Sequence, residues 1–161
     1  MKYLFFLLIL FFVSKNTLAL EMSCLFEEVH HNGDTHQGIL ITKNDKFRYQ
    51  YFSKNLYTII YKENLFFYVE NTDYSKFFKI TNNTDMLKTI IDIIKEFPNI
   101  KKAYYFNDTI IRVEHSETEE IIRRIVVLSD QIKMSIYLND CKNVSLKDFY
   151  FSWSPFWEYK Y

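Results

Sequence analysis

Glycine and proline are scarce in this chain, with only two of each among its 161 residues. The turns of a compact fold must therefore come mainly from asparagine and aspartate, which tolerate left-handed backbone conformations. Such residues recur through the first half at intervals of roughly ten, a spacing typical of an antiparallel meander. The low glycine content also leaves no glycine-rich loop that could hold a phosphate group.

Enzyme and metal signatures are lacking as well. The sequence has no Gly-x-Ser-x-Gly nucleophile motif, and no nucleophile with an obvious base. Three histidines cluster at His30, His31 and His36, but their spacing matches no zinc motif. We therefore expect a binding protein rather than an enzyme, with no catalytic residue, no metal and no cofactor.

Neither sign of charge is in excess, since 20 basic residues balance 20 acidic ones. Binding to nucleic acid requires a clustered excess of lysine and arginine, and no basic patch occurs. A nucleic-acid partner is not expected.

Only one long apolar run occurs, at residues 4–13, and Lys2 precedes it. It has the length of a signal-peptide core and is short for a membrane span. Small residues at Thr17 and Ala19 predict cleavage after Ala19, which leaves residues 20–161 as one exported domain with a formal charge of −2. An uncleaved N-terminal anchor is the alternative.

The two cysteines, Cys24 and Cys141, would reach an oxidising compartment after export. A disulfide between them and two separate buried thiols are both compatible with the sequence. Lipid attachment at Cys24 is not expected, because Glu21 stands where a lipobox has an aliphatic residue.

The rest of the chain is rich in β-branched and aromatic residues, which favour strands. The predicted strands are 25–31, 36–42, 47–52, 57–61, 65–70, 74–80, 103–106, 109–115, 121–128, 132–138 and 149–153. Segment 121–128 also fits one face of a helix. We expect a mainly β domain with a strongly curved antiparallel sheet.

One segment, 84–97, has helical spacing instead. Thr84 is placed to cap its start, and Pro98 to end it. The side chains predicted to face the sheet are Met86, Leu87, Ile90, Ile91 and Ile94, and those predicted to face water are Lys88, Asp92 and Lys95.

The stretch 38–51 reads as two strands around a tight turn. Phe47, Tyr49 and Tyr51 alternate, so they share one face of the second strand. Large aromatic side chains at this period either belong to the protein core or face an apolar ligand.

The wording of this stretch, Gly-x-Leu-x-x-Lys-x-x-x-Phe-Arg-aromatic-x-Tyr, resembles LolA-type outer-membrane lipoprotein carriers. Residues 59–68 resemble the second hairpin of that family, and 84–87 resemble the start of its lid helix. Residues 128–136 and 148–155 resemble its closing strands. The resemblance covers roughly residues 25–155.

The resemblance implies a half-barrel of about ten or eleven strands with an internal apolar cavity and one or more lid helices. It implies a monomeric periplasmic chaperone that carries the acyl chains of lipoproteins from an inner-membrane releasing transporter to an outer-membrane acceptor. The implied residues of the cavity and lid are Phe47, Tyr49, Tyr51, Leu65, Phe67, Met86, Leu87, Ile90, Ile91 and Ile94.

The chain departs from the family at Asn44-Asp45, where the family has an Arg-Pro turn whose arginine latches the lid. Lys43 and Arg48 are poor substitutes, so we expect apolar packing alone to hold the helix. This departure keeps open a non-transporting lipid sensor or a protein-docking module of the same fold. A receptor variant would need a lipobox at Cys24.

Overall fold

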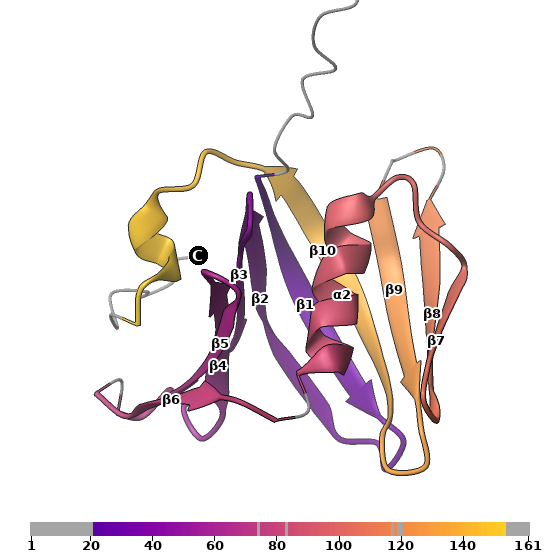
Figure 1. The fold of residues 1–161 in the computed structure, drawn as a ribbon. Helices are drawn as coiled ribbons and strands as arrows, with labels where there is room; N and C mark the ends of the chain where they lie inside the picture. Colours follow the sequence, from indigo (N-terminus) through magenta and orange to yellow (C-terminus); the bar gives the residue numbers. More distant parts are fainter. Residues whose placement is uncertain (1–20, 74, 83, 117, 119–120, 154–161) are drawn as a thin grey trace, which may run out of the picture.

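The computed structural model describes residues 21–73, 75–82, 84–116, 118 and 121–153. The predicted signal peptide, 1–19, and the last residues, 157–161, lie outside this range. The described chain is mainly β, with one ten-stranded antiparallel sheet and the helix α2 (Asp85–Glu96) (Figure 1). The strands are β1 (Met22–His30), β2 (Thr35–Lys43), β3 (Lys46–Tyr51), β4 (Tyr57–Lys62), β5 (Leu65–Glu70), β6 (Phe77–Ile80), β7 (Ala103–Phe106), β8 (Thr109–Ser116), β9 (Ile121–Leu128) and β10 (Lys133–Asn143).

The sheet consists of two meanders, β1–β6 and β7–β10, and the first strand of the first meander pairs with the last strand of the second. The strand order is β6-β5-β4-β3-β2-β1-β10-β9-β8-β7, so β1 and β10 pair at the centre and β6 and β7 form the two edges. The segment between the meanders contains α2, which lies across one face of the sheet (Figure 1). We call this face the inner face.

Ten of the predicted strands are confirmed to within a few residues, and segment 121–128 is a strand rather than a helix. The structure also joins Cys24 of β1 to Cys141 of β10 by a disulfide, across the central pair of strands. No helix in the described part of the chain is both long enough and apolar enough to cross a membrane.

The inner face carries the main core, because alternate side chains of the strands meet there. In β9 an irregularity in the pairing with β8 brings both Ile122 and Ile125 to this face. Phe26 of β1 stacks on Tyr49 with ring centroids 3.8 Å apart. This contact needs a glycine at position 38, where a Cβ atom would lie 2.4 Å from the Phe26 ring and 2.1 Å from the Gln50 carbonyl oxygen. Gly38 therefore gives the Phe26 ring its place over β2.

Helix α2 closes this core with Ile90, Ile91, Ile93 and Ile94, all of them buried. Sequence periodicity had not included Ile93. The helix begins after Thr84 as expected, but the Thr84 side chain makes no capping hydrogen bond, so that prediction was wrong.

The opposite, outer face has a second cluster, formed by Ile39, Ile41, Leu146 and Phe151. Arg48 of β3 is buried beside it and donates hydrogen bonds from Nη1 to the carbonyl oxygens of Tyr150 (3.1 Å) and Ser152 (2.9 Å). The predicted strand 149–153 was wrong: the chain forms a 3-10 turn, η2 (Asp148–Phe151), packed on β3 and β4. The aromatic residues of this segment therefore belong to a turn that packs on the sheet, and not to a strand paired within it.

Candidate functional site

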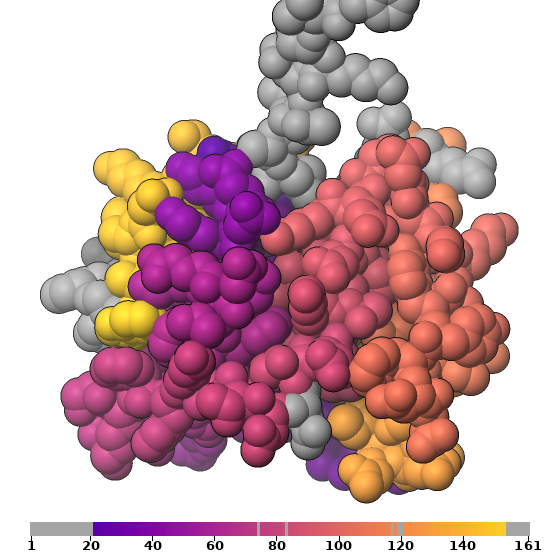
Figure 2. Space-filling view, in the orientation of Figure 1, coloured from indigo at the N-terminus to yellow at the C-terminus, as the bar shows by residue number. Residues whose placement is uncertain are grey.

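A pocket of about 350 Å³ lies between the sheet and the N-terminal half of α2. Its walls come from the inner faces of β1, β3, β4 and β10 and from three residues of α2: Met86, Leu87 and Ile90. In Figure 2 the atoms of α2 fill the middle of this face, between the strands of the two meanders. The volume is at the lower end of the range for small-molecule pockets, about 300–1,000 Å³.

Six of the predicted binding residues meet in this pocket. Phe47, Tyr49 and Tyr51 line it from β3, and Met86, Leu87 and Ile90 line it from α2. The three aromatic residues are at most 8 % exposed, so they belong to both the core and the pocket wall. The two readings of the aromatic stripe, core or ligand site, therefore do not exclude each other.

The other four predicted residues lie elsewhere. Ile91 and Ile94 are buried in the core at 2 % and 1 % exposure and do not line the pocket. Phe67 packs on the Trp153 ring at the outer face, with centroids 4.7 Å apart, and Leu65 lines a separate depression near Asp85.

The turn between β4 and β5 explains the error for Leu65 and Phe67. Glu63 and Asn64 both have positive φ angles, 53° and 60°, which gives a tight two-residue connection. This turn pairs Lys62 with Leu65 and Tyr61 with Phe66. Phe66 therefore shares the inner face with Tyr61, while Leu65 and Phe67 face outward.

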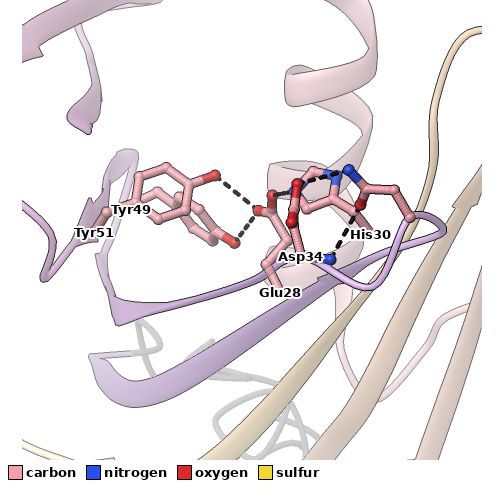
Figure 3. Close-up of polar contacts among 6 residues, drawn as sticks. Glu28, His30, Asp34, Tyr49 and Tyr51 are labelled. Carbon is pink, nitrogen blue, oxygen red and sulfur yellow. Dashed lines mark hydrogen bonds and ion pairs between the residues drawn. The ribbon is translucent and has the colours of Figure 1, made fainter. Parts of the chain in front are cut away.

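A polar cluster lies in the wall of the pocket, beside its apolar side chains, and Figure 3 shows the contacts within the cluster. Glu28 of β1 is only 4 % exposed. Its Oε2 accepts hydrogen bonds from the hydroxyl groups of Tyr49 (2.9 Å) and Tyr51 (2.8 Å). Its Oε1 lies 2.5 Å from Nε2 of His30, an ion pair when the imidazole is protonated.

This environment changes the acidity of the neighbouring tyrosines. Burial, followed by the negative charge of Glu28, raises the pKa of both Tyr49 and Tyr51 far above the ordinary value. Burial also raises the pKa of Tyr57, in spite of an opposing hydrogen bond with Tyr51. All three phenols therefore remain neutral hydrogen-bonding groups at physiological pH.

Sequence reasoning missed Glu28 entirely, although the signal was present. Cys24, Phe26, Glu28 and His30 are two residues apart, so they share the inner face of β1. A charged residue in an apolar stripe of this kind needs buried partners, and the tyrosines of β3 supply them.

The pocket opens toward the turns β1–β2 and β9–β10, where its lining residues are exposed. These rim residues are His31, Asn32, Gln131 and Lys133. His30 and His31 both line the pocket near this rim, and the rings of His30 and His36 are 5.4 Å apart. Among the described residues, no group of three or more His, Cys, Asp or Glu side chains could hold a metal ion.

An ion pair joins α2 to the β2–β3 turn. Lys95 Nζ donates to Asp45 Oδ1 at 2.9 Å, and this bond and the lysine charge lower the pKa of Asp45. The expectation that apolar packing alone holds the helix was wrong in this respect, because the helix itself supplies the cation. The Asp45 side chain is 90 % exposed, so the pair adds little to the packing of the isoleucines.

The turn also has a backbone reason to lack arginine. Asn44 has a φ of 51°, in the left-handed region that asparagine adopts more readily than arginine.

The chain matches no family model and no curated protein.

Proposed function

We propose that this chain is a periplasmic carrier of the LolA type, which binds the acyl chains of lipoproteins and moves them from the inner to the outer membrane without chemistry. The pocket between the sheet and α2 carries this proposal, because an aromatic stripe and the apolar side of an amphipathic helix both form its wall. On this proposal the sheet acts as a half-barrel and α2 as its lid.

The gradient of burial along α2 supports a lid that opens from its N-terminal half. Met86 and Leu87 are only partly buried, whereas Ile91, Ile93 and Ile94 are at most 2 % exposed. The pocket is small for a group with several acyl chains, so loading requires the N-terminal half of α2 to move outward. Acyl chains gain roughly 25 cal/mol for each Å² of apolar surface that they bury, and they compete with the helix for the same wall.

The remaining parts of the proposal follow the resemblance. A signal peptide exports the protein, which acts as a monomer. It receives its cargo from an inner-membrane lipoprotein-releasing transporter and delivers it to an outer-membrane acceptor.

The first test is chemical analysis of the cargo. The full chain is expressed with its own signal in a bacterial periplasm, purified without detergent, and extracted for mass spectrometry of lipids and lipopeptides. Co-purified acylated peptides support the proposal. Purified protein without lipid, which also fails to take up a lipopeptide from vesicles, would refute it.

A charge placed on the pocket side of α2 gives the matched variants. Leu87→Glu puts a carboxylate into the apolar wall and is expected to abolish cargo binding. Lys88→Glu changes an exposed neighbour and is expected to leave binding intact. Binding without transfer to acceptor membranes would favour the non-transporting lipid sensor.

A further inference from the structure

We propose that the pocket selects amphiphiles whose polar end carries a positively charged nitrogen, and that Glu28 receives this nitrogen. The inference rests on the proposed function, since it requires an apolar chain in the same pocket. It adds a class of polar group that the ligand must carry.

Glu28 has acceptor capacity left. An ionised carboxylate offers about four acceptor positions. Three partners occupy it: the hydroxyl groups of Tyr49 and Tyr51 on Oε2, and the imidazole of His30 near Oε1. Oε1 can therefore accept one further hydrogen bond from a ligand in the pocket.

The tyrosines strengthen this preference for a donor. Tyr49 and Tyr51 each donate their only hydroxyl hydrogen to Glu28, so toward a ligand their oxygens can only accept. The hydroxyl group of Tyr57, which also lines the pocket, is hydrogen-bonded with Tyr51. Glu28, Tyr49 and Tyr51, whose mutual contacts Figure 3 shows, therefore offer only acceptors to a ligand. An ammonium group supplies several N–H donors and a complementary charge, whereas a carboxylate or phosphate supplies neither.

Burial favours a charged donor over a neutral one. Folding has already removed the Glu28 carboxylate from water, so the contact costs the hydration of the ligand but not that of the carboxylate. Lys133 at the rim has the opposite preference and would attract an anion. It is exposed, however, so water and salt weaken its field more than that of Glu28.

For a lipoprotein cargo, the inference distinguishes two forms of the N-terminal residue. A diacylated form with a free α-ammonium group can place that group against Glu28. A form with an acylated amino terminus offers only one neutral amide N–H. The pocket is therefore expected to prefer the form with the free amino group.

The test compares three probes with the same chain and different ends: dodecylamine, dodecanol and dodecanoate. Calorimetric titration of the purified protein at neutral pH and low salt, below the micelle threshold, gives each affinity. Dodecylamine is expected to bind at least about tenfold more tightly than dodecanol, the effect of one charge-assisted hydrogen bond. Dodecanoate is expected to bind most weakly.

Two variants show where any preference originates. Glu28→Gln keeps the shape and an acceptor oxygen for the tyrosines, and it is expected to remove the preference for the amine. Glu27→Gln removes the same charge from the neighbouring position on the outer parity of β1, and it is expected to keep the preference.

The outcomes separate this inference from the proposed function. Equal affinities for all three probes, or tightest binding of dodecanoate, would refute the role of Glu28 and leave the apolar pocket standing. Failure of every probe to bind would refute the pocket itself, and both proposals with it. If Glu28→Gln does not fold, the ratio of the amine and alcohol affinities in the unaltered protein still decides.

Discussion

Ile90 and Ile94 lie one helical turn apart on α2, and their replacement by alanine separates a pocket wall from a packed core. Both side chains face the sheet, but Ile90 lines the pocket at 7 % exposure while Ile94 is 1 % exposed and does not line it. We expect Ile94→Ala to destabilise the protein clearly more than Ile90→Ala.

The magnitude follows from what each change removes. Isoleucine to alanine deletes a methyl and an ethyl group, a transfer term of about 2.4 kcal/mol at about 0.8 kcal/mol per carbon. At Ile94 the surrounding atoms must also bear a new cavity, which brings the loss to about 3–4 kcal/mol. At Ile90 the vacated space joins an existing pocket, so the loss stays near 2 kcal/mol or below. The helix propensity of alanine favours both variants equally and cancels from the comparison.

Urea unfolding followed by circular dichroism, with the disulfide intact, measures both free energies of unfolding. Binding of a lipopeptide to each variant provides the second readout. Ile90→Ala is expected to change this affinity, and Ile94→Ala to leave it within a few-fold of the original value. Equal losses of stability, or a larger loss at Ile90, would show that the pocket wall is packed as tightly as the core.

Three further changes test other parts of the structure. The raised pKa values of Tyr49 and Tyr51 predict stability that is complete below pH 10 and is lost above it, because these tyrosines ionise in the unfolded chain first. The free energy of unfolding, measured with urea, should fall by about 1.4 kcal/mol per pH unit for each tyrosine, and a value that does not change with alkaline pH would contradict this. Arg48→Ala is expected to lower the free energy of unfolding by about 3 kcal/mol and to expose η2 to proteolysis, and Arg48→Lys is a poor replacement because lysine lacks the planar guanidinium. Unchanged protease resistance would contradict the idea that Arg48 holds η2 in place. Reduction of Cys24–Cys141, which are separated by 117 positions, is expected to lower the free energy of unfolding by up to about 5 kcal/mol, and an unchanged urea midpoint in reductant would argue against the bond.

Local periodicity predicted most of the fold because each strand carries its own signal. The alternation in β3 and the helical spacing in 84–97 need no information from distant residues. The C-terminal segment differs, because its conformation depends on a partner far away in the sequence. Phe149, Phe151 and Trp153 lie two residues apart, as in a strand. The backbone nevertheless forms a turn, and its carbonyl oxygens at Tyr150 and Ser152 accept hydrogen bonds from buried Arg48.

The pocket could be predicted only in part, for a similar reason. Phe47, Tyr49 and Tyr51 were placed by parity within one strand, whereas Leu65 and Phe67 depended on the register across a turn. Reading Glu63-Asn64 as a two-residue turn with positive φ angles would have corrected them. To predict the role of Glu28, one must know which tyrosines lie opposite it, and that is a property of the assembled sheet.

The central pairing of β1 with β10 has a consequence for the newly made chain. The first meander can form as soon as residues up to β6 are available, but the free side of β1 then has no neighbour until β10 arrives. An unpaired strand edge is a template for association with other chains. Contacts between residues so distant in the sequence form slowly. Until β10 pairs with it, the partly synthesised chain therefore exposes an edge of β1 at which other chains can associate. A chaperone that shields the unpaired edge of β1, or an oxidant that joins Cys24 to Cys141 once β10 has docked, would therefore raise the yield of folded protein.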